Sequence, residues 1–160
     1  PIGSGVILAA DMLGQAGGRD VAATLLIMGQ AQDREAALLA PVAHAMTDVT
    51  GFGLAGHVHA MCQASKLDAD LFHDAIPTYP GARVLSDLGV SSTLMPANYL
   101  DAPVAGPHDA LLYDPQTAGG LLAAVPEKLS TTVLQALIAQ GCTGHIIGRL
   151  RKGTGCLYLS

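Results

Sequence analysis

The chain has 160 residues, 50% of them hydrophobic and only 13% charged, with a net charge of −5. A soluble domain usually carries about a quarter charged residues, so this chain is unusually apolar. Low hydrophobicity with high charge, the composition of disordered chains, is absent, and the length suits one domain with its own core.

Charge and hydropathy disfavour two kinds of partner. Nucleic-acid binding needs a basic stripe, but the chain has only eight Lys and Arg, three of them close together at Arg149, Arg151 and Lys152. A membrane span needs about 20 continuous apolar residues. The longest apolar run, 36–46, is shorter and contains His44. We therefore expect neither a nucleic-acid nor a membrane partner.

The cysteines and the first residues indicate the cellular setting. Cys62, Cys142 and Cys156 are odd in number and have no CxxC spacing. We expect neither a disulfide framework nor a structural zinc site, which favours a cytoplasmic location. The chain begins at Pro1 without a basic segment or an initiating Met. No signal peptide is expected, and the missing Met indicates a fragment or a processed piece.

The first half of the chain is expected to alternate helices and strands. In chain order these are a strand or extended entry over 2–10, helices over 21–28 and 34–43, a strand over 45–49, a helix from 52 onward and an edge-like strand over 67–72. The helix after 52 is the best marked, because apolar residues from Leu54 to Ser65 recur at three- and four-residue spacing.

The second half adds a long loop and more strands. In chain order we expect a helix over 81–88 closed by Gly89, a surface loop over 90–107, strands over 110–113 and 120–125, a helix opened by Pro126 and ended by Gly141, and strands over 143–151 and 156–159 joined by a hairpin-type turn at 152–155. Strands mixed with helices throughout predict an α/β or α+β sandwich.

The first chemical motif is the segment Met46–His57 (MTDVTGFGLAGH). Asp48 ends a predicted strand and is followed by Thr50, Gly51 and a helix start. Such a turn offers backbone N–H groups and a positive helix end to an anion. Because Asp48 would repel phosphate unless a cation lay between them, the pattern suggests a Mg²⁺–phosphate site. On residue types alone, a helix cap by Asp48 or Thr50 is the commoner use of such a segment.

The same segment also fits a dinucleotide-binding interpretation. Gly51–Gly56 (GFGLAG) matches GxGxxG between a strand and a helix, and Asp74 falls about where a ribose-binding acid would lie. Against this interpretation, the strand carries Thr47, Asp48 and Thr50, whereas a buried parallel strand is apolar.

The second motif is Tyr113–Gly120 (YDPQTAGG). A turn with Asp114 at its first position and Pro next is a common connector. Gln116 and Thr117, ahead of paired glycines, add more hydrogen-bonding groups than a connector requires. We expect these side chains either to orient a ligand or to hold a neighbouring loop.

The remaining polar side chains give weaker signals. His57 and His59 lie two residues apart on the predicted helix, about 200° around its axis, so they cannot share a metal from one face. Cys62 lies on the apolar stripe and is expected in the core. HExxH, GxSxG and GxxxxGK[ST] motifs do not occur.

Taken together, the two long motifs resemble a known enzyme family. Ala45–His57 and Leu112–Leu122 are similar to signature stretches of selenophosphate synthetases (selenide, water dikinases), members of the AIR-synthetase-like superfamily. Weaker agreement extends over most of the chain, from Pro1–Val6 to Ile147–Gly148. The similarity covers only the C-terminal half of that enzyme.

The resemblance implies a fold and an activity. It implies one domain over 1–160, a mixed β-sheet flanked by helices, whose N-terminal ATP-binding and catalytic partner domain is missing. The family makes selenophosphate from selenide, ATP and water, releasing AMP and phosphate and using Mg²⁺. By the resemblance Asp48 holds Mg²⁺ on the ATP phosphates. The other matching positions on the ligand side are Thr50, Gly51, Asp114, Gln116 and Thr117.

The resemblance also sets limits and leaves alternatives. The family's catalytic residues belong to the missing N-terminal half, so none is expected here and this chain alone is expected to be inactive. Expected partners are its own N-terminal domain, small-molecule substrates and, at full length, a second copy in a homodimer. The alternatives are a domain of another AIR-synthetase-like ATP-using enzyme, or a non-catalytic nucleotide-binding or dimerisation domain.

Overall fold

The structure, a computed structural model, describes all 160 residues. The helices are α1 (Ser4–Met12), α2 (Gly18–Met28), α3 (Asp33–Leu39), α4 (Gly53–Ser65), α5 (Ala82–Asp87), α6 (Met95–Asp101) and α7 (Glu127–Ala139), with short 3-10 helices η1 (His73–Ala75) and η2 (Ala110–Tyr113). The strands are β1 (Ala45–Asp48), β2 (Leu67–Leu71), β3 (Val104–Ala105), β4 (Leu121–Ala124), β5 (Gly148–Lys152) and β6 (Leu157–Leu159).

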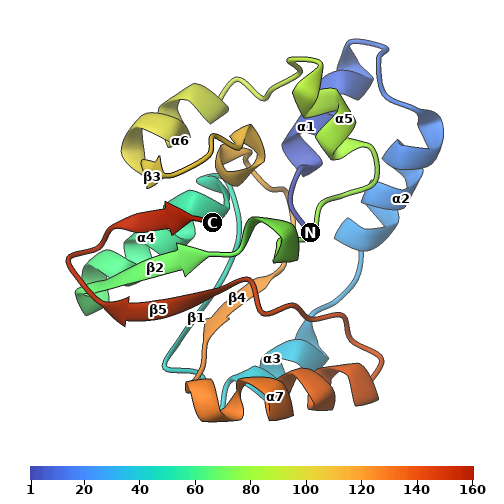
Figure 1. Cartoon of the computed structure of the whole chain (residues 1–160). Coiled ribbons are helices and arrows are strands. Elements are labelled where there is room, and N and C mark those ends of the chain that lie inside the picture. Colours follow the sequence, from blue (N-terminus) through green and yellow to red (C-terminus); the bar gives the residue numbers. More distant parts are fainter.

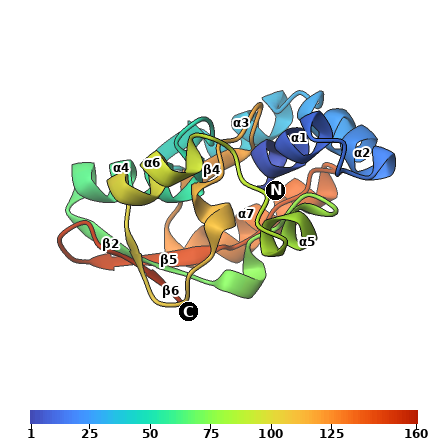
Figure 2. The same cartoon turned by 90° about the horizontal axis from the view of Figure 1, so that it is seen from above.

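The strands form two separate sheets. A four-stranded mixed sheet has the order β3-β6-β2-β5, with β2 parallel to β6 and antiparallel to β5. A two-stranded antiparallel sheet pairs β1 with β4, and Asp48 lies opposite Leu121. Helix α4 lies over the mixed sheet, while α1, α2 and α5 gather at the opposite end of the molecule (Figures 1 and 2). This mixed α/β architecture confirms the expected fold class. None of its helices has the length and apolar character required to cross a membrane.

One hydrophobic core joins these layers. It takes residues from α1, α4, β2, β6 and η2, and its fully buried members include Ile7, Ala55, Leu111 and Leu112. Helix α4 contributes Leu54, Val58 and Cys62 as well, so the apolar stripe predicted for this helix faces the core. The core anchors both ends of α4, and its N-terminal end leads back to Asp48.

The segment expected as a strand over 2–10 is a helix, and that prediction was wrong. Only Ile2 forms a bridge, parallel to Thr78, and α1 begins at Ser4. Gly3 has φ of 108°, a left-handed conformation that turns the chain into the helix. The N–H groups of Gly3 and Ser4 donate to the side chain of Gln116. A capping partner so distant in sequence is not visible in local propensity.

Two further expectations around residues 90–113 were wrong. The expected surface loop contains α6, with Pro in its first turn, and the short strand β3. The expected strand over 110–113 is the 3-10 helix η2, where the Asp109 side chain accepts from the N–H of Leu111. Leu111, Leu112 and Tyr113 are all buried. Three consecutive buried side chains do not fit a strand with one solvent-facing side, because strand side chains alternate between faces.

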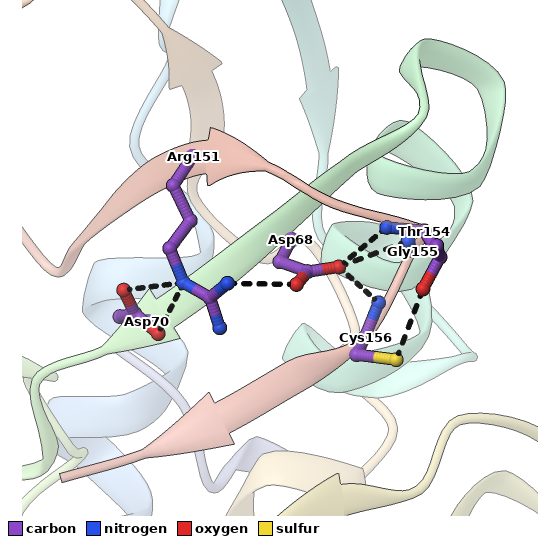
Figure 3. Close-up of polar contacts among 6 residues, drawn as sticks. All are labelled: Asp68, Asp70, Arg151, Thr154, Gly155 and Cys156. Atoms are coloured by element: carbon purple, nitrogen blue, oxygen red, sulfur yellow. Dashed lines mark hydrogen bonds and ion pairs between the residues drawn. The ribbon is translucent and has the colours of Figure 1, made fainter.

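The expected hairpin between the last two strands was also wrong, because β5 and β6 lie on opposite sides of β2. The expected edge-like strand is therefore internal. Asp68 explains the polar positions that suggested an edge: its Oδ1 accepts from the N–H groups of Thr154, Gly155 and Cys156 at 2.8, 3.1 and 2.9 Å. Figure 3 shows this carboxylate between the turn and Arg151, whose guanidinium also contacts Asp70.

Most of the remaining boundaries agree with the sequence-based expectations. The strand at 45–49, the helix after 52 and the helix at 81–88 are confirmed as β1, α4 and α5. The expected helix over 34–43 ends at Leu39, and the expected strand over 143–151 begins only at Gly148. The helix after Pro126 begins at Glu127, and Gly141, with φ of 75°, follows its end.

The topology excludes the dinucleotide-binding interpretation. That fold requires parallel strands on either side of the glycine-rich helix. Here β1 and β2 flank α4 but belong to different sheets, and β1 is antiparallel to its only neighbour. Asp74, the expected ribose-binding acid, lies in η1, where its carboxylate pairs with His73 at 3.2 Å. The glycines of the GxGxxG match therefore belong to the connection from β1 into α4 and not to a dinucleotide-binding turn.

Candidate functional site

Asp48 occupies the end of β1 with its side chain exposed. Its carboxylate makes neither a hydrogen bond nor an ion pair within the chain. It borders an open hollow of about 510 Å³. The other residues around the hollow come from the α2–α3 connection, β1, the turn before β4 and the first residue of β4: Gln30, Gln32, Met46, Thr47, Ala118, Gly119 and Leu121. An exposed carboxylate without a partner is available to a ligand.

The capping alternative for Asp48 and Thr50 does not hold. Helix α4 starts at Gly53, and no side chain caps its N-terminus. The Gly53 N–H instead donates to the backbone carbonyl of Thr50 at 3.0 Å. The added Cβ of any other residue at Gly53 would come within 2.8 Å of the Leu112 carbonyl, and its φ is 70°. The turn is therefore built from backbone contacts, and Asp48 is not needed to start the helix.

Thr50 and Gly51 lie in the turn between Asp48 and α4. The Thr50 N–H donates to Nε2 of His57 at 2.9 Å, and Thr50 Oγ1 lies 3.1 Å from the same nitrogen. The Gly51 carbonyl accepts from the Asn98 side chain at 2.9 Å. Contacts from α4 and α6 thus hold the turn on both sides. Burial lowers the pKa of His57, and the charge of Asp48 opposes that shift.

Asp114 and Gln116 are buried, with 0% and 4% of their surface exposed. Oε1 of Gln116 accepts from the N–H groups of Gly3 and Ser4 and from the Ser4 hydroxyl, at 3.0 to 3.1 Å. Oδ2 of Asp114 accepts from the Gly5 N–H at 2.9 Å and from Nε2 of Gln116 at 3.1 Å. The two side chains therefore satisfy the first N–H groups of α1. These contacts support the loop-holding expectation.

The carboxylate of Asp114 is only half satisfied. Its Oδ1 is buried without a hydrogen-bond partner. Burial raises the pKa of Asp114 to about 6, against the lowering effect of the hydrogen bonds from Val6, Gln116 and Gly5. Protonation relieves the cost of burying this charge.

The two sequence motifs meet in one place. The N–H of Gln116 donates to the Thr50 carbonyl, and the N–H of Val49 donates to the Gly120 carbonyl, both at 3.0 Å. An added Cβ at Gly119 would lie 2.1 Å from the Val49 carbonyl oxygen, so only glycine fits there. Thr117 is exposed, and its N–H donates to the Ser4 hydroxyl at 3.1 Å. Asp48, Thr50, Gly51 and Thr117 thus lie on joined segments.

Sequence reasoning missed two residues that support this arrangement. The Gln32 side chain donates to the Gly119 carbonyl at 2.8 Å and ties the α2–α3 connection to the second motif. His57 was considered only as a metal ligand and set aside, because it could not share a metal with His59. Its actual partner is Thr50, only seven residues earlier in the sequence. No local pattern marks Gln32, because its partner is 87 positions away.

A magnesium ion would find only part of its coordination shell here. The chain contains no group of three or more His, Cys, Asp or Glu side chains able to hold a metal. Mg²⁺ in phosphate-transfer sites keeps several waters and takes one or two carboxylates plus substrate phosphates. Asp48 fits the role of one such carboxylate, and the remaining ligands would have to come from elsewhere.

A larger cavity of about 880 Å³ lies between the two sheets, bordered by α3 and α7. Its lining is mostly hydrophobic, and Asp48 is not part of it. The ion pair of Arg149 with Glu127, at 2.6 Å, lies at its exposed border. The cavity is therefore separate from the carboxylate that the motifs single out.

These features match an established family. Residues 1–156 match the family described as AIR synthase related protein, C-terminal domain. The chain therefore belongs to this family.

The chain is also similar in sequence to curated proteins named selenide, water dikinase. The chain is 38% identical over 116 residues to a protein named selenide, water dikinase from Cronobacter sakazakii, covering 69% of this chain and 33% of the relative. It is 41% identical over 116 residues to the protein of the same name from Shewanella baltica. For that of Pseudomonas straminea the identity is 32% over 125 residues, covering 72% of this chain and 35% of the relative. The chain thus spans about a third of the length of these relatives.

Solved structures agree on the fold. The hydrogenase maturation protein HypE from E. coli superposes with a TM-score of 0.65 at 21% identity, over 95% of this chain and 41% of that one. The protein tt0281 from Thermus thermophilus superposes with a TM-score of 0.55 at 19% identity, over 97% of this chain and 45% of that one. At such identities the likeness concerns the fold alone.

Proposed function

We propose that this chain is the C-terminal domain of a selenide, water dikinase, which makes selenophosphate from selenide, ATP and water and releases AMP and phosphate. The observation that carries the proposal is the identity of 38–41% to proteins of that name. The likeness to HypE does not favour a second candidate, because it is a likeness of fold.

In this proposal Asp48 contributes one carboxylate to a Mg²⁺–ATP site. Bound Mg²⁺ neutralises negative charge on the phosphates during transfer. Asp48 suits this role because it is exposed, unpaired and held at a strand end. The 114–120 loop supports that strand end through the bonds of Val49 with Gly120 and of Gln116 with Thr50.

The buried side chains have a different part. Asp114 and Gln116 are enclosed and bonded to the start of α1, so they act by position rather than by contact with a ligand. Thr50, Gly51 and Thr117 remain candidates for the ligand side. Thr117 is exposed, whereas Thr50 and Gly51 are half-buried.

The site is completed by the N-terminal domain of the full-length protein, which in this proposal supplies the catalytic groups and further metal ligands. One carboxylate cannot by itself hold the Mg²⁺ that neutralises a nucleotide's phosphates. We further propose that the full-length protein is a homodimer, as the sequence resemblance implies.

The test compares the full-length protein with the 160-residue chain. With selenide, ATP and Mg²⁺, the full-length protein is expected to release AMP in proportion to selenophosphate. The 160-residue chain is expected to release none above background. AMP release by the full-length protein that does not depend on selenide would contradict the assigned substrate. Sustained AMP release by the 160-residue chain would contradict the division of labour between domains.

A further inference from the structure

Each of the two sheets has a strand with an unpaired edge. The order of the mixed sheet is β3-β6-β2-β5, so β5 has a neighbour on one side only. In the smaller sheet β4 pairs only with β1. A free strand edge presents unpaired N–H and C=O groups that can pair with another strand.

The larger cavity, of about 880 Å³, lies along these two edges. Residues 121–125, which include all of β4, and residues 148–150 of β5 border it as unbroken runs. Side chains alternate between the two faces of a strand, so a cavity against one face meets only every second residue. Strand β2, which is paired on both sides, borders the cavity in that way, with Ala69 and Leu71. The unbroken contact of β4 and β5 indicates that their free edges open into the cavity.

The cavity is too large to be an ordinary packing defect. An apolar cavity of about 150 Å³ can stay dry in a protein, but the cost of an unfilled cavity rises with its volume. The lining is mostly hydrophobic, and helices α3, α4 and α7 contribute Leu39, Leu54, Val58, Leu134 and Leu137. We therefore expect apolar groups from elsewhere to fill this space in the full-length protein.

The first residues of the chain lie at the same cavity. Pro1 and Ile2 both border it. The N–H of Ile2 donates to the Pro77 carbonyl, and the N–H of Tyr79 donates to the Ile2 carbonyl, both at 2.9 Å. These bonds form a parallel bridge with Thr78 and hold Ile2 in a strand-like arrangement. Residues that precede Pro1 in the full-length protein therefore join this chain at the border of the cavity.

We propose that the segment directly before Pro1 in the full-length protein lies in this cavity as an additional strand between β4 and β5, and joins the two sheets into one. The inference rests on the proposed function for one premise, that a further domain precedes this chain. In keeping with that premise, this chain covers only 33% of the Cronobacter sakazakii relative. Pairing with the added strand satisfies the free edges of both β4 and β5.

The surroundings define the chemistry of this segment. Helix α4 packs on the mixed sheet, whereas α3 packs on β4 and α7, and all three helices border the cavity. A strand covered in this way is a near-continuous run of apolar residues, and β-branched side chains suit it best. Strands β4 and β5 have four and five residues, and the added strand should match them. The occupant is thus an uncharged apolar segment of the same polypeptide rather than a small molecule.

The added strand also connects the preceding domain with the candidate site. Asp48 ends β1, which pairs only with β4. A strand on the free edge of β4 therefore holds β1 and Asp48 in a fixed position relative to the mixed sheet.

The first test measures backbone hydrogen exchange in the full-length protein without nucleotide or selenide. We expect the amides of the segment directly before Pro1 to exchange as slowly as those of β2, an internal strand of the mixed sheet. Residues 91–93, whose N–H groups have no hydrogen-bond partner, give the fast reference. Exchange before Pro1 as fast as that of 91–93 would overturn the proposal.

The second test asks whether the cavity has room in the full-length protein. Val133 of α7 borders the cavity, and Val133→Phe adds volume there. Because a strand already fills the space in our proposal, we expect the thermal midpoint to fall by about 3 °C or more. Ile138→Phe is the matched control, since Ile138 lies on the same helix, is 60% exposed and does not border the cavity. Its midpoint should stay within about 1 °C of wild type.

An unchanged or raised midpoint in Val133→Phe would overturn the proposal, because the cavity would then hold no strand. Nile red, an uncharged apolar dye, distinguishes a strand from a small-molecule ligand. We expect the full-length protein to show no saturable dye binding that depends on Val133. Saturable binding that is lost in Val133→Phe and kept in Ile138→Phe would show an open apolar pocket and overturn the proposal.

These outcomes are separate from those of the proposed function. Slow exchange before Pro1 without selenide-dependent AMP release would contradict the proposed function and leave the added strand standing. Selenide-dependent AMP release with fast exchange before Pro1 would do the reverse.

Discussion

Oε1 of Gln116 lies 3.1 Å from the backbone nitrogen of Ser4 and 3.0 Å from its hydroxyl, across 112 positions of sequence. The Ser4 hydroxyl in turn accepts from the N–H of Thr117 at 3.1 Å. The start of α1 and the second motif therefore hold each other in place. The backbone N–H of Gln116 also donates to the Thr50 carbonyl. Gln116 therefore links the start of α1, through its side chain, to the turn after Asp48, through its backbone.

Loss of this amide should destabilise the domain. Gln116→Met keeps the side-chain volume but leaves the N–H groups of Gly3 and Ser4 without an acceptor. Each unsatisfied buried donor costs about 1–3 kcal/mol. We expect the free energy of unfolding, measured by urea titration of the 160-residue chain, to fall by at least about 2 kcal/mol. Gln135→Met, at an exposed position of α7, serves as the control and should change it by less than about 0.5 kcal/mol.

Asp114 should give the domain an unusual pH dependence. Its pKa is raised to about 6 by burial, whereas an unfolded Asp titrates near about 3.9. A raised pKa means that the stabilising contribution is complete below the unfolded pKa and is lost as pH rises through the folded pKa. Between pH 4 and pH 7 this group alone should therefore reduce stability, by up to about 3 kcal/mol.

The matched variant is Asp114→Asn, which keeps an acceptor oxygen for the Gly5 N–H and has no charge to bury. All other titrating groups are the same in wild type and variant, so the difference between their pH profiles reports on Asp114. We expect the thermal midpoint of the wild-type chain to fall, relative to that of Asp114→Asn, as the pH rises from 5 to 7. Asp68 provides the opposite control: hydrogen bonds from Cys156 and Thr154 lower its pKa, so its contribution is lost only in acid. Parallel pH profiles for wild type and Asp114→Asn would refute the burial of a titrating carboxylate.

The position of Asp48 at the end of a strand was predicted better than the elements around it. Asp48 at a strand end before a glycine turn was legible from residue types, because the strand, turn and helix there are local in sequence. Gln32 was not, since its bond to Gly119 depends on tertiary packing. The contact of His57 was not predicted, because the sequence analysis considered only a metal or a second histidine as its partner. In the structure its partner is the backbone N–H of Thr50.

The errors in the fold have a common physical cause. Ile2–Ala10 contains β-branched residues and glycines that locally favour an extended chain, but Gln116 caps it as a helix. The alternation of Leu67–Leu71 indicated an edge strand, yet Asp68 and Asp70 are polar because they bind a distant turn and Arg151. In each case a long-range polar contact decides the structure, and such a contact leaves no periodic signal.

The surface near Asp48 should make the isolated chain self-associate. Phe52 is 64% exposed, and Met46, which borders the same hollow as Asp48, is 37% exposed. Exposed apolar patches mark interfaces, and in our proposal the N-terminal domain covers this one. We expect sedimentation velocity of the 160-residue chain to show concentration-dependent association that Phe52→Ser weakens.

The control for this surface is Leu26→Ser, because Leu26 on α2 is 74% exposed and does not border the hollow beside Asp48. Association that responds equally to both substitutions would indicate general stickiness rather than a docking face. A chain that stays monomeric at all concentrations would contradict an uncovered interface beside Asp48.

The central claim is that Asp48 acts through its charge on a bound cation. Asp48→Asn keeps the size of the side chain and removes the charge. Because Asp48 neither caps α4 nor pairs with another side chain, the thermal midpoint should stay within about 2 °C of wild type. Loss of one carboxylate from a Mg²⁺–ATP site should lower selenide-dependent turnover at least about 100-fold.

The most direct measurement is therefore made on two full-length proteins, wild type and Asp48→Asn, in parallel. For each, the thermal midpoint and the rate of selenide-dependent AMP formation are determined at saturating ATP over a series of Mg²⁺ concentrations. We predict equal midpoints and a collapse of turnover that excess Mg²⁺ only partly reverses. Near-normal turnover in Asp48→Asn at ordinary Mg²⁺ concentrations would contradict the assignment of Asp48 to the cation.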